Sequence, residues 1–173
     1  YDVSVTYTIF TFAAISSDSK YIRLDALDVS VSNTDVDTAG VALSKTTAMV
    51  SETGNEDVFT VVLTAEPASN VVLDASSASS GEVTVSPAQL TFTSANWDTP
   101  QQVTVTGVDD SPPTVDGDQA VNVALAVNDA LSDNAWNGLA DTDVSVTNQD
   151  NDTPGFTVSK TSASVSEDGT SDT

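Results

Sequence analysis

The chain has 173 residues, 39% of them hydrophobic, which is enough for one full domain with a core of its own. Its 26 acidic and 4 basic residues give a formal net charge of −22, which argues against nucleic acid or an anionic membrane as a partner. Cysteine and histidine are absent, which excludes disulfide staples, thiolate chemistry and Cys/His metal sites, and no apolar run has transmembrane length.

The N-terminal part predicts two strands that end at an acidic joint. Apolar residues alternate over 1–9 with the period of a half-buried strand, and a second short strand is expected over 27–32. The joint, 33–40, carries two carboxylates on alternate residues, Asp35 and Asp37.

Seven further runs with strand-like alternation follow from residue 38, and none has a helical period. They cover 41–50, 58–64, 71–75, 82–93, 101–107, 119–127 and 142–147. Pro87 bends the fourth run because it has no amide hydrogen to donate to a ladder. Short alternating strands at this spacing predict an all-β protein, a seven-stranded antiparallel Greek-key β-sandwich of the immunoglobulin-like class.

The chain contains an internal repeat with an offset of 115 residues, which aligns Asp28 with Asp143 and Gly40 with Gly155. Of the 30 positions that begin at Asp28, 18 are identical to their partners, far above chance. The repeat predicts three parts: the last strands of a preceding repeat (1–37), one complete sandwich repeat (38–152) and the first strand of a following repeat (153–173).

Strand directions predict where the acidic loops meet. If each of the seven strands reverses direction, the turns after the first, third and fifth strands lie beside the end of the seventh. These segments carry Glu52, Asp109, Asp110, Asp116, Asp118, Asp150 and Asp152. Carboxylates that converge need compensation, and oxygen ligands in flexible loops without His or Cys favour calcium over zinc or copper.

The order of short motifs resembles the Calx-beta family. The motifs are Val50-Ser51-Glu52-x-Gly54, Asn96-Trp97-Asp98-Thr99-Pro100-Gln101, Val103-Thr104-Val105-x-Gly107-Val108-Asp109-Asp110, Asp116-Gly117-Asp118 and Asp150-Asn151-Asp152. More closely, the repeat resembles the extender repeats of giant RTX-type adhesins of Gram-negative bacteria.

This resemblance implies a seven-stranded sandwich with calcium held by the first-turn glutamate, the acidic loop before the sixth strand and the terminal Asp-x-Asp. By position these are Glu52, the loop from Asp109 to Asp118, and the pair Asp150 and Asp152. Asp35 and Asp37 match only the terminal motif, and Glu167 matches only the first-turn glutamate.

The function expected from the sequence is structural: a calcium-binding repeat of a long extracellular adhesin at the cell surface, in contact with neighbouring repeats of the same chain. Two alternatives remain. The loop 128–141, with Trp136, is a candidate edge for binding carbohydrate or protein. The incomplete ends predict a filament subunit that self-associates through exposed edge strands. No nucleophile–base constellation is present, so we expect no enzyme activity.

Overall fold

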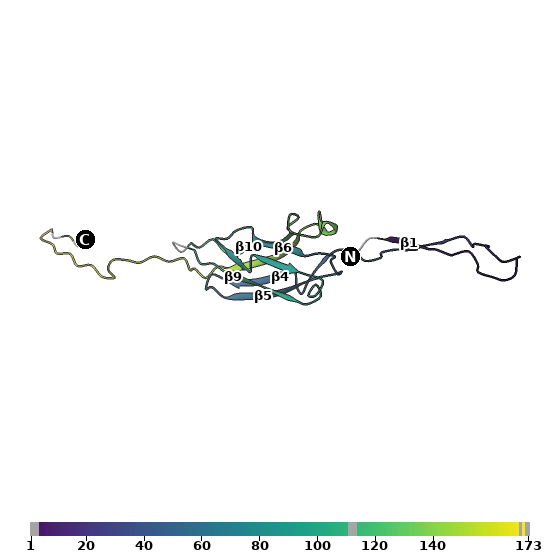
Figure 1. Cartoon of the computed structure of the whole chain (residues 1–173). Coiled ribbons are helices and arrows are strands. Elements are labelled where there is room, and N and C mark those ends of the chain that lie inside the picture. Colours follow the sequence, from purple (N-terminus) through teal and green to yellow (C-terminus); the bar gives the residue numbers. More distant parts are fainter. Residues whose placement is uncertain (1–3, 111–113, 170, 172–173) are drawn as a thin grey trace.

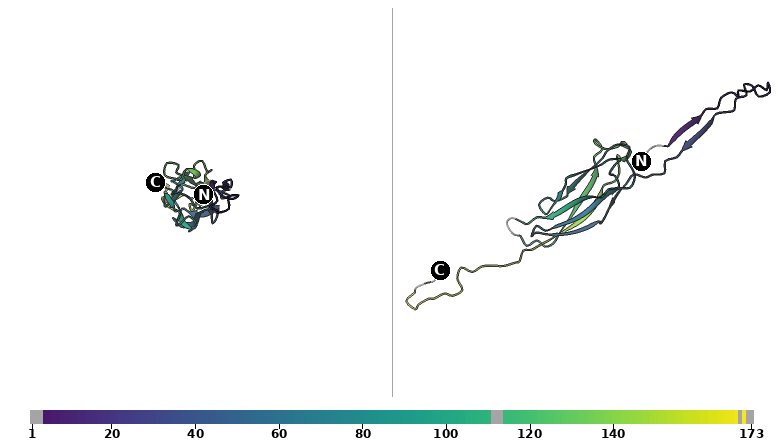
Figure 2. Two further views of the ribbon diagram at one scale, coloured as in Figure 1. Left: turned by 45° about the vertical axis from the view of Figure 1, so that its right-hand side comes forward. Right: turned by 60° about the horizontal axis from the view of Figure 1, so that its bottom comes forward.

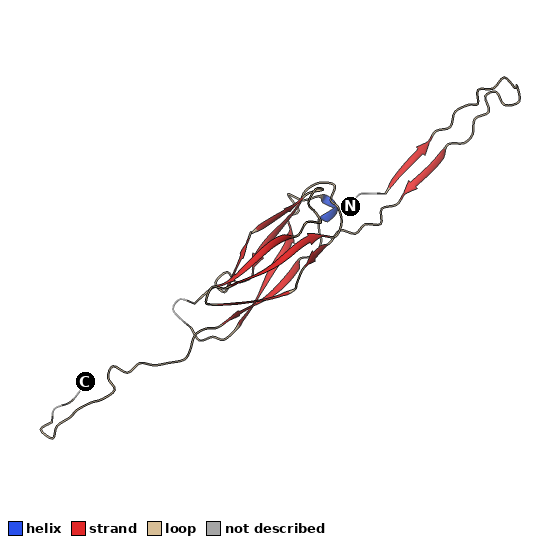
Figure 3. Ribbon diagram, turned by 90° about the horizontal axis from the view of Figure 1, so that it is seen from below, coloured by secondary structure: helices blue, strands red, loops and turns tan. Residues whose placement is uncertain are grey.

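The computed structural model describes residues 4–110, 114–169 and 171. A β-sandwich forms the middle of an elongated molecule, and the N-terminal hairpin and the C-terminal segment leave it from opposite ends (Figures 1 and 3). Over the described part of the chain, no helix has the length and apolar character needed to cross a lipid bilayer.

The N-terminal hairpin consists of β1 (Val5–Ile9) and β2 (Val29–Asn33), which form a two-stranded antiparallel sheet of their own. Tyr7 lies opposite Val31 and Ile9 opposite Val29, so the apolar residues share one face. Every residue of both strands is exposed. The assignment of residues 1–37 to a preceding repeat stays a prediction.

Within its described residues, the sandwich contains nine strands and one short 3₁₀ turn, η1 (Asn134–Trp136). The strands are β3 (Val41–Leu43), β4 (Thr47–Ser51), β5 (Glu56–Leu63), β6 (Val71–Ser77), β7 (Val83–Ser86), β8 (Gln89–Phe92), β9 (Gln101–Gly107), β10 (Gln119–Val127) and β11 (Thr142–Gln149). One sheet has the order β3-β5-β9-β7 and the other the order β4-β11-β10-β6-β8. The chain crosses between the sheets repeatedly, and the predicted all-β Greek-key sandwich is confirmed.

Two details of the prediction are wrong. Two of the seven runs divide between the sheets: 41–50 forms β3 and β4, and 82–93 forms β7 and β8 on either side of Pro87. The sandwich is also not wholly antiparallel, because β4 and β11 pair in parallel. The first and seventh runs point the same way in a seven-run sandwich, so they are parallel wherever they become neighbours.

The core lies between the two sheets and is built from the inward residues of each strand. Alternation places them as expected: the buried residues of β5, β9, β10 and β11 are every second residue. The largest side chains with almost no exposure include Trp136, Phe59 and Phe92. Trp97 is partly buried and packs against the same core.

The residues after β11 leave the sandwich as an extended segment. No strand is assigned to the described residues that follow Gln149, and those from Thr153 onward are exposed. The prediction that 153–173 is the first strand of a following repeat therefore stays a prediction.

An ion pair joins the crossing between β3 and β4 to the start of β5. Lys45 Nζ donates to Asp57 Oδ1, and Asp57 also accepts from the amides of Met49 (N to Oδ2, 3.1 Å) and Val58 (N to Oδ1, 2.8 Å). The hydrogen bond from Lys45, helped by these two amides, lowers the pKa of Asp57 against the opposing effect of burial.

Asp57→Asn is therefore expected to lower the free energy of unfolding by about 1 kcal/mol at neutral pH. Because the folded-state pKa lies below the unfolded one, the stabilisation is full above the ordinary aspartate pKa and is lost as the pH falls through the folded-state value. Urea unfolding at several pH values should show the two proteins converging in acid. A difference that does not change with pH would contradict the role of the charge.

Candidate metal centre

At the end of the sandwich where the chain leaves β11, the turn after β4 lies beside the terminal joint, residues 148–155, which is the copy of the joint 33–40. β4 and β11 run in parallel with Ser51 opposite Gln149, so the chain leaves both strands side by side. Glu52 N donates to the carbonyl of Gln149 (3.1 Å), and Glu52 Oε2 accepts from Asn151 N (3.0 Å). A single glutamate thus holds the joint on the sandwich.

The loop between β9 and β10 is hydrogen-bonded to the same joint. Asp118 Oδ1 accepts from Asp150 N (3.1 Å), and Asp150 Oδ2 accepts from Gly117 N (2.9 Å). Asp150 Oδ1 accepts from Asp152 N (2.7 Å), which closes a tight turn in the joint. These bonds confirm the prediction that this loop and the joint converge.

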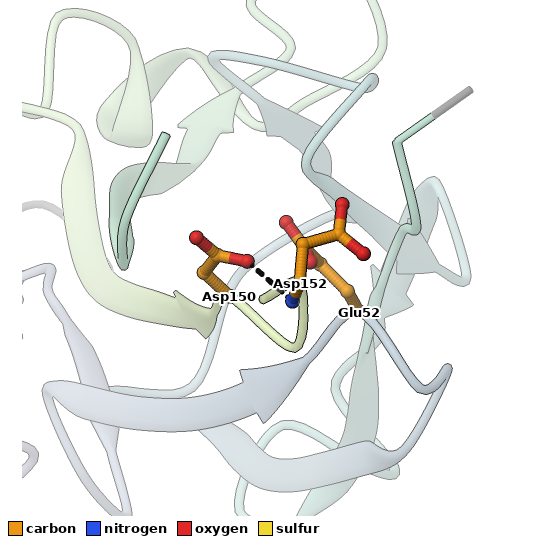
Figure 4. A group of neighbouring side chains, drawn as sticks. All are labelled: Glu52, Asp150 and Asp152. Atoms are coloured by element: carbon orange, nitrogen blue, oxygen red, sulfur yellow. Dashed lines mark hydrogen bonds between the residues drawn. The ribbon is translucent and has the colours of Figure 1, made fainter. Parts of the chain in front are cut away.

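Five carboxylates converge at this end: Glu52, Asp110, Asp116, Asp150 and Asp152, here called the Glu52 cluster. They form two overlapping groups, Glu52 with Asp150 and Asp152, and Glu52 with Asp110 and Asp116. Within each group one oxygen per residue lies within 4.8 Å of the others. Figure 4 shows the side chains of Glu52, Asp150 and Asp152 lying beside one another. Glu52, which belongs to both groups, is only 3% exposed.

The electrostatics of the cluster are those of crowded negative charge. The amide of Asn151 lowers the pKa of Glu52, but burial and the charges of Asp150, Asp110 and Asp152 together raise it above its ordinary value. Burial raises the pKa of Asp152, and the neighbouring carboxylates raise it further. The carboxyl groups of Glu52 and Asp152 therefore ionise less readily in the folded protein than they do in water.

Asp150 behaves in the opposite way because its oxygens face amide donors. The hydrogen bonds from Asp152 N and Gly117 N hold the pKa of Asp150 below its ordinary value. The joint thus contains one carboxylate stabilised as an anion by the backbone and another, Asp152, destabilised as an anion by its neighbours.

Two oxygens of the cluster have no hydrogen-bond partner. Within the described residues, Asp110 Oδ2 and Asp152 Oδ2 are both buried and unsatisfied. Buried carboxylate oxygens without donors are costly, and a hard cation satisfies them. Two ligand oxygens on opposite sides of one calcium ion lie about 5 Å apart, since calcium–oxygen distances are about 2.3–2.6 Å. The donor set and its spacing fit calcium.

The other predicted ligands take different places. Asp109 acts on the pKa of Asp152 and lies outside the two groups, while Asp118 is engaged with the amide of Asp150. Asp35 Oδ1 accepts from Asp37 N (3.0 Å), which repeats the turn of the terminal joint. Neither Asp35 nor Asp37 belongs to a carboxylate group in the described part of the chain. Metal binding by all nine predicted residues stays a prediction.

Asn148, which the sequence analysis did not identify, organises the base of the centre. Its side chain is 1% exposed, and its Nδ2 donates to Val108 O (3.0 Å) and Glu82 Oε2 (3.3 Å). Val108 N donates to Glu82 O (2.8 Å). Asn148 therefore fixes the start of the acidic loop against the last strand. The repeat could have pointed to this residue, because Asn148 aligns with an identical asparagine, Asn33.

The loop 128–141 does not offer the aromatic surface that one alternative requires. Trp136 is 1% exposed and belongs to the hydrophobic core, so its ring cannot stack on a sugar at the surface. The prediction that Trp136 forms a stacking surface is wrong, because its indole is buried by apolar packing. Binding of carbohydrate or protein by the rest of the loop stays a prediction.

Comparisons with known proteins give remote structural likeness. No protein-family model and no curated protein sequence matches the chain. The apo form of the Calx CBD1 domain is 14% identical with a TM-score of 0.46, over 65% of this chain and 96% of that one. Domains 4 and 5 of the S-layer protein SbsC are 16% identical with a TM-score of 0.43, over 71% and 59%.

The Escherichia coli chaperone DraB is 10% identical with a TM-score of 0.47, over 68% of this chain and 58% of DraB. The match thus spans less than two thirds of the SbsC and DraB structures. The chain contains a β-sandwich module with an acidic cluster at one end.

Proposed function

We propose that this chain is a calcium-binding structural segment of a long extracellular bacterial adhesin of the Calx-beta-like extender type. Its role is mechanical: it spaces and stiffens, and it catalyses no reaction. The repeat in the sequence supports a tandem array, and the acidic cluster at the exit joint supports calcium as the ion between neighbouring repeats.

One observation carries the proposal. The joint that leaves the sandwich is itself part of the Glu52 cluster, and two buried oxygens there, Asp110 Oδ2 and Asp152 Oδ2, lack a donor. Acidic loops that serve only solubility remain solvated. Here the shared carboxylate, Glu52, is buried at the base of the joint.

The residues of the cluster tie three segments into one unit. Glu52 fixes the turn after β4, Asp110 and Asp116 belong to the loop after β9, and Asp150 and Asp152 belong to the joint. A bound calcium ion supplies the positive charge that these carboxylates lack. Holding one ion in common orders the joint along the long axis of the sandwich, the direction in which Figure 3 shows the chain leaving.

The proposed location is extracellular. Calcium sites of extracellular modules have dissociation constants of about 10⁻⁴–10⁻³ M, weaker than those of the sites in cytosolic sensors and buffers. A chain with a net charge of −22 also gains from divalent cations by relief of self-repulsion.

Calcium is expected to raise the melting temperature of the protein by about 10 °C. At a calcium concentration roughly a hundredfold above Kd, linkage adds about 2.7 kcal/mol to the free energy of unfolding, which corresponds to that shift for a domain of this size. Magnesium should give a smaller rise because it demands a near-octahedral set of ligands. Identical melting temperatures in calcium and in chelator would remove the proposal.

The array is tested separately with a protein that carries several copies of residues 38–152 in tandem. Small-angle scattering should show a longer and more uniform particle in calcium than in chelator, because the joint becomes part of the rigid unit. Equal dimensions in both conditions would refute calcium-dependent stiffening while leaving calcium binding by a single sandwich in place.

A further inference from the structure

The N-terminal hairpin presents an apolar face that no described part of the chain covers. Tyr7, Ile9, Val29 and Val31 are 42–56% exposed although they lie on one side of a two-stranded sheet. Of the 20 large hydrophobic residues that are exposed in the described part of the chain, 12 fall between Val5 and Val31. Contiguous apolar surface of this kind marks an interaction site.

The hairpin has the same register as a pair of strands inside the sandwich. In β10 and β11, Gln119 lies opposite Asn148 and Val121 opposite Val146; in the hairpin, Val5 lies opposite Asn33 and Tyr7 opposite Val31.

Aligning Asn33 with Asn148 places the exposed residues of the hairpin on the buried positions of β10 and β11. Val121, Val123, Val144 and Val146 are at most 5% exposed in the sandwich. The apolar face of the hairpin therefore matches a face that is buried against the second sheet in the complete sandwich.

In the sandwich, the β10–β11 pair is extended by a third strand on the side of β11 that faces away from β10. β4 adds in parallel to the free side of β11, with Val146 opposite Ala48 and Asn148 opposite Val50. The corresponding edge of β2 pairs with no strand in the described part of the chain.

The segment matching β4 occurs again near the C-terminus. Residues 159–167 repeat 44–52 with seven of nine positions identical. Ala163 and Val165 stand where β4 has the buried Ala48 and Val50, and Val165 is 76% exposed. In the described part of the chain, a strand-forming sequence and the sheet edge that fits it are thus both exposed to solvent.

We propose that residues 162–166 of a second copy of this chain add as a parallel strand to β2, so that copies join head to tail. The register follows from β4 on β11: Val31 opposite Ala163 and Asn33 opposite Val165. The two segments of one chain lie at opposite ends of the sandwich in every view that separates them, so the donor comes from another molecule (Figures 1 and 2).

The contact is heterologous, since a tail meets a hairpin, and repetition of it gives an open chain of molecules and no closed dimer. It also brings Glu167 to Asp35 and Asp37, the counterparts of Glu52, Asp150 and Asp152. The association is therefore measured with calcium present. This proposal depends on strand pairing, whereas the melting experiment above tests calcium binding by the sandwich alone.

Sedimentation velocity of the full chain at increasing concentration should show growth into dimers and longer species. Val31→Asp, in the acceptor hairpin, and Val165→Asp, in the donor segment, should each weaken association at least ~10-fold, because a charge on the paired apolar face blocks edge-to-edge addition. Both positions lie outside the sandwich, so its melting temperature should not change.

Matched controls carry the same change outside the paired segments. Ile15→Asp lies in the connection between β1 and β2, and Val158→Asp lies before the donor segment, at the position that matches Leu43. Both residues are exposed, and both variants should associate like the original chain.

The decisive experiment mixes the two variants that should not associate on their own. Val31→Asp keeps an intact tail and Val165→Asp an intact hairpin, so an equimolar mixture should form a one-to-one dimer that grows no further. A chain that stays monomeric throughout the concentration range overturns the proposal. Association lost in Val31→Asp but kept in Val165→Asp also overturns it, because the hairpin face would then pack against another hairpin.

Discussion

Asp152→Asn is expected to raise the melting temperature of the calcium-free protein and to weaken calcium binding by at least ~10-fold. The substitution removes a carboxylate whose pKa is raised by burial and by its acidic neighbours, so the remaining charges repel one another less. It also removes a ligand oxygen, and even residues that only orient metal ligands contribute about 10- to 100-fold to affinity. Thermal unfolding across a calcium titration measures both effects.

Asp37→Asn is the matched control, because Asp37 occupies the same place in the earlier joint and follows the same Asp-x-Asp turn. It has no carboxylate group around it in the described residues, so the response to calcium should remain that of the original protein. An equal loss of the calcium response in both variants would contradict the assignment of the site to the complete sandwich.

Asp150→Asn should distinguish the role of Asp150 from that of Asp152. Asp150 accepts amide hydrogens from Gly117 and Asp152, and these bonds stabilise its charge. The amide of asparagine has one acceptor oxygen where the carboxylate has two. This variant should therefore lose stability in chelator as well as affinity for calcium, whereas Asp152→Asn should gain stability in chelator.

Gly107→Ala is expected to lower the free energy of unfolding by about 3 kcal/mol and the melting temperature by about 10 °C. A Cβ at this position would lie 2.1 Å from Ser51 O and 2.7 Å from Asn148 Oδ1. Ser51 is held in β4 by its pairing with β11, so the backbone cannot move aside without disrupting the ladder.

The same change should weaken calcium binding, because Ser51 precedes Glu52 and Asn148 lies two residues before Asp150. Gly81→Ala is its control: no atom lies within 4 Å of the added Cβ and its backbone is not left-handed. Chemical unfolding of both variants, with calcium and with chelator, measures the difference. A Gly107→Ala protein as stable as Gly81→Ala would show that the close packing of β9 against β4 has been misjudged.

The fold was largely predictable because apolar residues that alternate along a strand are the ones that are buried. Phe59, Val61 and Leu63 alternate in sequence and are all buried in β5. The period does not say which sheet a strand joins, since both sheets turn their inner faces to one core. For this reason the run 41–50 was expected as one strand, although its two halves pair with β5 and β11 in different sheets.

The meeting of the acidic loops was predictable from strand direction, and its details were not. Counting reversals placed Glu52, the loop after β9 and Asp150 at one end, where hydrogen bonds join them. The choice between Asp109 and Asp110 depends on loop backbone conformation, for which a lone sequence has no periodic signal. Asn148 was missed and Trp136 was misread, because an amide or an indole acquires its role only from the neighbours that bury it.

The parallel pairing of β4 with β11 has a mechanical consequence. The chain runs into the sandwich at one end and leaves from β11 at the other, so tension along the long axis draws these two strands in opposite directions. The five residue pairs between them, from Ser145 with Thr47 to Gln149 with Ser51, are then loaded in shear and must yield together. A peeling load would break them one at a time. The sandwich therefore resists pulling most strongly along its own long axis.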